Sequence, residues 1–322
     1  MNIYRSVRAV AGASGDGAID WDAVIEAATA STGKGDIDLT ADQRAGYADD
    51  VRDARDRVGE VAGFDFSLPE TIEVQHRHHW IDANVATFRR VMAPLERTAE
   101  AAGSMMGPAR VVNTGTMSVA LAYLARNVLG QYDPLLLADG DDHALYFVHP
   151  NIEAVAGQLG VATPRFRRWI AFHEVTHAAE FAAAPWLPGY MEDRITDAMD
   201  AMSGGGVSGF DISEFAELNA AMTAVEGYAE LLMDEAFDDE YADLRRKLDE
   251  RRGGGGPVAK LLRRALGLGV KRQQYERGAD FFEAVAAERG IEATAAVWDD
   301  PTTLPTTDEI DDPSAWIARV LE

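Results

Sequence analysis

The stretch RFRRWIAFHEVTHAAEFAAA, residues 165–184, decides how the rest of the chain is interpreted. Its apolar residues recur at helical spacing, and it lies between Pro164 and Pro185, residue types that mark the start and the end of helices. Within this predicted helix, HEVTH occupies positions 173–177. Side chains four residues apart on a helix share one face, with Cβ atoms about 5 to 6 Å apart. We therefore expect His173 and His177 to point the same way.

Two imidazoles at this spacing can bind one metal ion, with Zn–N distances of about 2.0 to 2.1 Å. Glu174 is rotated around the helix from His173, so its carboxylate can reach a metal-bound water rather than the metal. Zinc lowers the pKa of a bound water to about 7, and a nearby carboxylate can accept the proton as that water attacks a carbonyl. A chance match is disfavoured because the chain contains only 7 histidines. The motif predicts Zn²⁺ as cofactor, His173 and His177 as ligands, and Glu174 as general base.

A catalytic zinc ion needs a third protein ligand. The pattern HExxHxxGxxH would need glycine at 180 and histidine at 183, but the chain has Glu180 and Ala183, which excludes that class of site. A carboxylate from a later helix remains, and Glu226 in TAVEGYAELLMDEA is favoured because it lies on a largely apolar helix stripe. The adjacent Gly227 would let another backbone approach closely. Glu230, one turn later, is the alternative ligand or a residue that orients a ligand histidine. The alternative without a metal is that Glu226 lies at the edge of the core and pairs with an arginine.

Other polar residues carry weaker signals. We expect a cluster of three histidines before Trp80 to lie on a solvated helix face: His76, His78 and His79. His149 ends a predicted strand, where it could border a substrate cleft or form a hydrogen bond in a turn. Tyr228 and Tyr275 could donate to a developing oxyanion, although packing is the expected role of both.

The chain is strongly acidic. Its 322 residues include 54 Asp and Glu against 30 Lys and Arg, a formal net charge of -24. Arginine greatly outnumbers lysine, a pattern that favours adaptation to high salt, where surface repulsion is screened. A merely acidic mesophilic protein is the alternative. In either case we expect no nucleic-acid partner, because phosphate binding requires a basic patch.

The chain lacks cysteine and long apolar segments. The chain has 0 cysteines, which excludes disulfides, thiolate catalysis and cysteine-bound metal. Arg5 and Arg8 interrupt the apolar residues at the N-terminus, and no segment approaches the roughly 18 apolar residues of a membrane span. We therefore predict a cytoplasmic protein with no membrane partner.

The hydrophobic pattern predicts an α+β fold that is mainly α-helical, with a small sheet beside the HExxH helix. Helices are expected over 18–62, with Asp20 and Thr40 as caps, over 71–103 and over 117–130. Short strands are expected near Val111 and Phe147. We assign residues 1–105 to a helical N-terminal region and 106–322 to the catalytic region, together forming one compact unit.

The C-terminal half reads as helices joined by flexible loops. The glycine-rich stretches at 203–209 and 253–257 are predicted to be loops. A helix is expected from a cap at Ser213 to Phe237, and another from Lys271, followed by an irregular connection at 301–307 rich in proline and threonine.

Several long segments resemble one known family: HHWIDAN, LGQYDPLLL, LYFVHPNI, FHEVTHAAEFAAAPWL, VEGYAELLMD, QYERGADFFEAV and LPTTDEIDDPSAWIARV. They are similar to zincin-like hydrolases that are widespread in actinobacteria, occur in haloarchaea, and are often labelled as associated with biosynthesis of a deazaflavin coenzyme. The resemblance implies a zincin-like fold, a zinc site formed by His173, His177 and the glutamate of the Glu-Gly pair, Glu226, and a peptidase or amidase activity. Relatives commonly have histidine where this chain has Tyr228.

Two functions follow from these observations. The first is a zinc-dependent metallopeptidase or amidase acting on a peptide or another amide-containing substrate. The second is a catalytically degenerate zincin in which zinc stabilises a binding or maturation protein.

Overall fold

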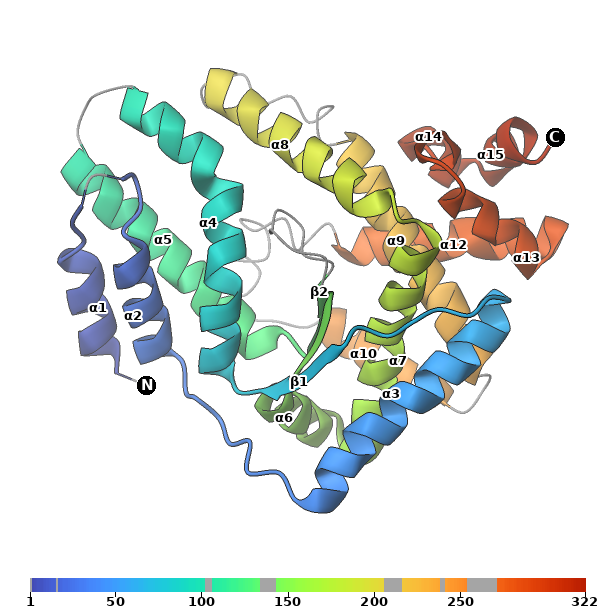
Figure 1. The fold of residues 1–322 in the computed structure, drawn as a ribbon, viewed down its shortest axis with the longest axis horizontal. Helices are drawn as coiled ribbons and strands as arrows, with labels where there is room; N and C mark the ends of the chain where they lie inside the picture. Colours follow the sequence, from blue (N-terminus) through green and yellow to red (C-terminus); the bar gives the residue numbers. More distant parts are fainter. Residues whose placement is uncertain are drawn as a thin grey trace.

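The computed structural model describes residues 2–15, 17–101, 106–133, 143–205, 216–237, 241–253 and 271–322. These residues form a mainly helical structure with one small sheet near its centre, which confirms the predicted fold class (Figure 1). The longer helices are α1 Ile3–Ala11, α2 Trp21–Ser31, α3 Ala41–Ala62, α4 Arg77–Ala101, α5 Met106–Asn127, α6 His149–Leu159, α7 Thr163–Ala183, α8 Leu187–Gly205, α9 Ala216–Phe237, α10 Ala242–Gly253 and α12 Lys271–Arg289. The C-terminal segment adds α13 Ile291–Thr294, η3 Ala295–Trp298, η4 Pro301–Thr303, α14 Thr307–Asp311 and α15 Pro313–Val320.

The predicted helix caps at Asp20 and Thr40 are confirmed. The Asp20 carboxylate accepts a hydrogen bond of 3.0 Å from the Ala23 backbone N–H at the start of α2. Thr40 forms a capping box with Gln43 at the start of α3, in which each side chain accepts from the other residue's backbone N–H. These bonds satisfy backbone donors that have no partner inside the helix.

The sheet has the order β1-β3-β2, with β1 (Thr71–Gln75) parallel to β3 (Ala144–Val148) and β2 (Gly130–Asp133) antiparallel to β3. The strand predicted near Phe147 is confirmed as β3. The helix predicted from residue 71 is wrong at its start, because residues 71–75 pair with β3 and α4 begins only at Arg77. A short alternating segment such as TIEVQ takes its structure from a partner strand that local sequence does not reveal.

The strand predicted near Val111 is also wrong, because this segment belongs to helix α5. Thr114 on the same helix is fully buried, and its hydroxyl accepts a hydrogen bond of 3.0 Å from the backbone N–H of Asp20. Packing against the start of α2 thus outweighs the strand preference of the β-branched pair at 111–112. Strand β2, which the sequence did not predict, lies at the edge of the sheet beside α7.

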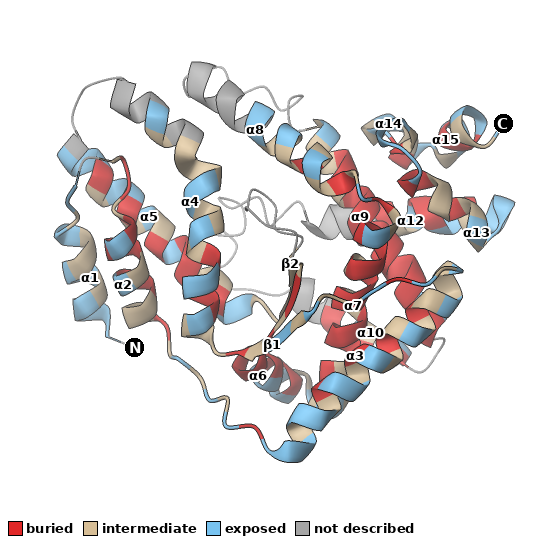
Figure 2. Ribbon diagram, in the orientation of Figure 1, coloured by how far each residue is buried: buried red, intermediate tan, exposed pale blue. Residues whose placement is uncertain are grey.

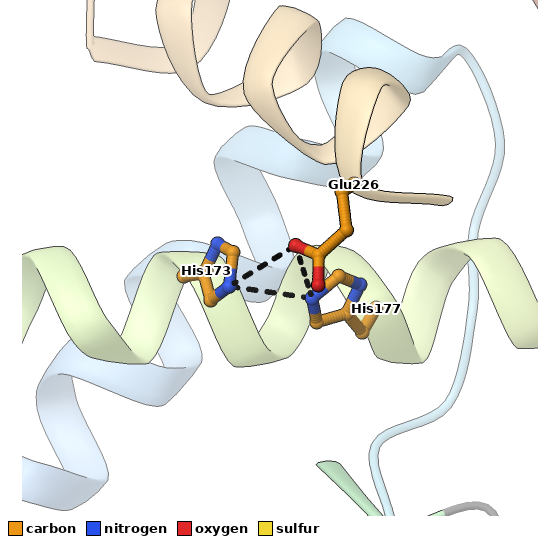
Figure 3. Close-up of side chains that lie close together, drawn as sticks. All are labelled: His173, His177 and Glu226. Atoms are coloured by element: carbon orange, nitrogen blue, oxygen red, sulfur yellow. Dashed lines mark hydrogen bonds and ion pairs between the residues drawn. The ribbon is translucent and has the colours of Figure 1, made fainter. Parts of the chain in front are cut away.

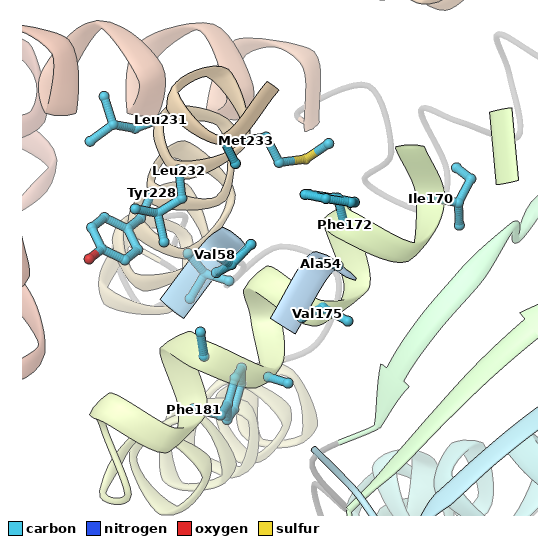
Figure 4. Close-up of a cluster of buried hydrophobic side chains, with 14 of the residues drawn as sticks. Ala54, Val58, Ile170, Phe172, Val175, Phe181, Tyr228, Leu231, Leu232 and Met233 are labelled. Atoms are coloured by element: carbon cyan, nitrogen blue, oxygen red, sulfur yellow. The ribbon is translucent and has the colours of Figure 1, made fainter. Parts of the chain in front are cut away.

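The predicted helix over 165–184 is confirmed as α7, which is buried around most of its circumference (Figure 2). It packs against α3 on one side and α9 on another, and Phe172 and Val175 are fully buried between them (Figure 4). Two ion pairs join α7 to α3: Arg167 to Asp50 at 2.6 Å and Arg168 to Asp53 at 2.5 Å. This packing fixes the position of the HExxH motif.

The buried apolar residues that the structure describes form two clusters. The larger one packs α3, α6, α7, α9 and α12, and the smaller one packs α2, α4 and α5. Both clusters include residues from before and after residue 105, so the proposed boundary there stays a prediction. In the part of the chain described above, no helix combines the length and the apolar character needed to cross a membrane.

The C-terminal predictions had mixed outcomes. Helix α9 ends at Phe237 and α12 begins at Lys271, as predicted. Residues 203–205 belong to α8 and residue 253 ends α10, so those ends of the predicted loops are wrong. Residues 206–209, 254–257 and the cap at Ser213 lie outside the described residues. The connection at 301–307 contains η4 and the first residue of α14.

Gly227 on α9 contacts the backbone of Gly278 on α12. A Cβ added to Gly227 would lie 2.3 Å from the Gly278 carbonyl carbon, and one added to Gly278 would lie 2.3 Å from the Thr223 carbonyl oxygen. The predicted close backbone approach at Gly227 is therefore confirmed. Helix α9, and Glu226 with it, is held at a distance from α12 that only a pair of glycines permits.

We expect Gly227→Ala to lower the free energy of unfolding by about 1 to 3 kcal/mol, because backbone atoms cannot move aside as a flexible side chain could. Urea denaturation measures this change. The control is Gly157→Ala on α6, where an added Cβ meets no heavy atom within 4 Å and should stabilise the helix by about 0.5 to 1 kcal/mol. Similar effects of the two substitutions would contradict this account of the α9–α12 contact.

Candidate metal centre

Three potential metal ligands from two helices meet at one point (Figure 3). Helix α7 positions His173 and His177 one turn apart, and α9 brings Glu226 toward them. The two Nε2 atoms are 3.3 Å apart, and Oε2 of Glu226 lies 4.0 Å from each of them. The carboxylate is almost completely buried, whereas both imidazoles retain slight exposure.

These distances fit a small divalent cation bound by nitrogen and oxygen. Two ligands of a tetrahedral zinc ion, each about 2.05 Å from the metal, are about 3.3 Å apart. The two Nε2 atoms are already at this separation. A shift of less than 1 Å would bring the Glu226 carboxylate to the same distance from them. Two imidazoles and a carboxylate are also a ligand set found in catalytic zinc sites. The residues present therefore fit zinc.

Glu174 lies on a different side of α7 from His173 and His177. Its Oε2 accepts a hydrogen bond of 2.8 Å from the backbone N–H of Tyr132 on β2. Gly130, at the start of the same strand, leaves space for this side chain, because a Cβ there would lie 2.5 Å from Glu174 Cγ and Oε1. Edge strand β2 therefore sets the position of the Glu174 carboxylate.

Glu180 is completely buried beside the second histidine. Its Oε2 is 2.7 Å from Nδ1 of His177. A proton shared between these atoms leaves Nε2 of His177 directed at Glu226 and His173. His173 has a different neighbour, because its ring is stacked on that of Trp169 with centroids 5.8 Å apart. Each imidazole is thus held by a second residue of α7.

The buried charges at the site perturb one another. Burial opposes a charge on His177, but nearby carboxylates, that of Glu180 first, outweigh it and raise the pKa of His177 to about 9. Burial raises the pKa of Glu180 to about 7, against the opposing influence of His177. Without a metal, the charged form of His177 is therefore favoured at neutral pH.

Comparison with known proteins agrees with this geometry. A family model described as zincin-like metallopeptidase matches residues 19–209 and 210–317. The chain belongs to the zincin-like metallopeptidase family. Its structure is also similar to the crystal structure of a protein from Chloroflexus aurantiacus that is described as a candidate hydrolase with a novel fold. The two chains are 31% identical with a TM-score of 0.78, and the match covers 94% of this chain and 98% of the other. No curated protein matches significantly.

The other residues considered for the site of this zincin-like chain lie elsewhere. Glu230 forms an ion pair with Arg245 of α10, outside the cluster of potential ligands. Tyr228 packs in the core against Phe282 and Trp298, as expected. Tyr275 has no described side chain.

The remaining histidines that the sequence singled out have ordinary structural contacts. His149 is buried at the start of α6, with Nδ1 2.9 Å from the hydroxyl of Tyr47 on α3, so it makes a contact between helices rather than the expected hydrogen bond within a turn. The cluster before Trp80 is only partly solvated. His78 Nε2 is 2.8 Å from the carbonyl oxygen of Thr32, and His76 accepts a hydrogen bond from the His79 backbone N–H.

Three residues of the site were missed from the sequence: Glu180, Gly130 and Tyr132. Glu180 had a readable signal, because a carboxylate three residues after a histidine on a helix can reach its imidazole. In the sequence, Glu180 served only to exclude the HExxHxxGxxH pattern, which requires glycine at that position. Gly130 and Tyr132 had no such signal, because they meet Glu174 only through the tertiary fold.

We expect Glu180→Gln to weaken zinc binding by about 10- to 100-fold, because the neutral amide orients His177 less strongly and no longer supports its basicity. Competition with a chromogenic chelator measures this affinity. The control is Glu230→Gln, which removes a buried carboxylate of α9 that does not contact either histidine and should leave the affinity unchanged. Equal affinities for wild type and Glu180→Gln would contradict the orienting role.

Zinc affinity should also rise with pH. A metal bound by His177 would need its Nε2 lone pair, and below the pKa of about 9 a second proton occupies that nitrogen. Affinity should therefore increase by up to about tenfold per pH unit from pH 6.5 and level off near pH 9, with proton release on binding. Chelator-buffered titrations, with calorimetry in buffers of different ionisation enthalpy, test this. Constant affinity across that range would show that His177 is already neutral.

Proposed function

We propose that this protein is a zinc-dependent peptidase or amidase in which His173, His177 and Glu226 hold the metal and Glu174 is the general base. One observation carries the proposal. Potential ligand atoms from these two histidines and Glu226 lie within 4.8 Å of one another on the HExxH helix and its neighbour. The family assignment supports hydrolysis and, through its description as a metallopeptidase family, a peptide substrate.

The residues of the site would divide the chemistry between them. A bound zinc ion would supply a water of lowered pKa and would polarise the scissile carbonyl. Glu174, held by the Tyr132 N–H, would accept a proton from the attacking water and return it to the leaving amine. Glu180 would keep His177 in the tautomer that binds metal through Nε2. Glu174 and Glu226 are both glutamates, but their different neighbours would give them different roles.

Other features of the proposal rest on sequence alone. We infer adaptation to high salt from the net charge of -24 and the preference for arginine. A cytoplasmic location and an association with deazaflavin coenzyme biosynthesis stay predictions.

The test combines metal content with turnover in full-length protein prepared at high salt. Wild type should hold about one zinc per chain, Glu226→Ala should lose or weaken it, and Glu174→Gln should keep it. Turnover of a peptide pool from a digested proteome, followed by mass spectrometry, should fall by about 10²- to 10⁴-fold in Glu174→Gln. Full turnover by that variant would remove Glu174 from the role of base. Zinc binding without any cleavage by wild type would favour a zinc-stabilised binding or maturation protein.

A further inference from the structure

A cavity of about 460 Å³ lies beside the candidate metal centre, between helices α7, α9 and α10. Trp169, which lines it, precedes His173 by one helical turn and stacks on its ring. Glu230, which also lines it, follows Glu226 by one helical turn. The cavity therefore begins one turn away from the potential ligands along both helices. Residues four apart share one face of a helix, so the cavity lies on the same side of α7 and α9 as the potential ligands.

The walls of the cavity are largely aromatic or apolar. Trp169, Met233 and Phe237 are buried side chains that line it, and Tyr241 closes one side. Aromatic faces of this kind attract cations as well as apolar groups. The protein's own arginines show this preference nearby, because the Arg165 guanidinium lies 5.0 Å from the Tyr241 ring centroid.

The charged residues of the cavity are mostly acidic. Among the described residues, three carboxylates line it, those of Glu230, Asp234 and Glu235, against one guanidinium, that of Arg245. Arg245 is already occupied, because it forms ion pairs with both Glu230 and Asp234. Three negative charges and one positive charge leave a net charge of -2 among these lining residues. Glu230 is buried, whereas Asp234 and Glu235 are exposed to solvent, where an incoming charged side chain could reach them.

We propose that this cavity binds a cationic side chain, arginine or lysine, of the substrate that the metal centre cleaves. The aliphatic stem of the side chain would pack on Trp169 and Met233, and its charged head would meet Asp234 and Glu235. A carboxylate in the same place would be repelled by the acidic groups and would have to displace one of them from Arg245. The proposal rests on the proposed hydrolase function, of which it names the substrate class.

The first test measures binding without catalysis. The probes are Nα-acetyl-arginine amide and Nα-acetyl-citrulline amide, which have nearly the same shape but differ by one charge. Calorimetry on zinc-loaded, full-length Glu174→Gln protein should give at least about tenfold tighter binding of the arginine probe, the preference expected for one charge-assisted hydrogen bond. Equal affinities for the two probes would overturn the proposal.

Matched variants separate the cavity from the overall negative charge of the chain. Asp234→Asn/Glu235→Gln neutralises the net charge of the cavity and replaces two exposed side chains, so the fold should be retained. This double variant should abolish the preference for the arginine probe over the citrulline probe. The control, Asp197→Asn/Glu217→Gln, removes two exposed carboxylates that pair with Arg194 and should leave the preference intact. An arginine preference that persists in the cavity variant would overturn the proposal.

Cleavage of the peptide pool distinguishes this proposal from the proposed function. Wild type should cleave next to arginine or lysine, and the cavity variant should lose this selectivity while still cleaving. Cleavage with no basic residue near the scissile bond would overturn the cavity proposal and leave the hydrolase function standing. Arginine-selective binding without any cleavage would support the cavity and overturn the hydrolase function.

Discussion

The burial of charged groups between α7 and α9 is the constraint on which the rest of the structure depends. Glu180 is fully buried, and Glu226 and both imidazoles of the motif have little exposure. Moving such groups out of water costs free energy unless they are paired or bind a metal. Glu180 and His177 meet part of this need by sharing a proton, and a cation bound between the histidines and Glu226 would meet the remainder.

The surrounding packing keeps these groups together. Ion pairs to α3 fix α7 from one side, and the Gly227–Gly278 contact fixes how closely α9 approaches α12. Helix α7 also packs apolar residues against α3 and α9, including Phe172 and Val175, and this packing holds its buried ionisable residues in position. The ion pairs to α3 and the Gly227–Gly278 contact hold the helices of the candidate metal centre in place, which is what a preorganised site requires.

The four glutamates near this centre illustrate how environment separates similar side chains. Glu226 faces two imidazoles, Glu180 orients one of them, Glu174 is tied to the edge strand β2, and Glu230 turns away to Arg245. None of these differences is present in the residue type. They follow from which element covers each position, and they give each carboxylate a different partner.

The sequence by itself determined the helix over 165–184, the convergence of two histidines on one face of it, and the mainly helical class. These follow from periodicity and residue spacing, which act within one or two turns of chain. It also indicated Glu226 and the close approach at Gly227, because a carboxylate and a glycine on an apolar helix are costly without a reason. Only the tertiary structure decided that residues 71–75 are a strand, that β2 positions Glu174, and that Trp169, Glu230 and Arg245 border one cavity. Those arrangements depend on contacts between segments far apart in the chain, and local propensity carries no information about such partners.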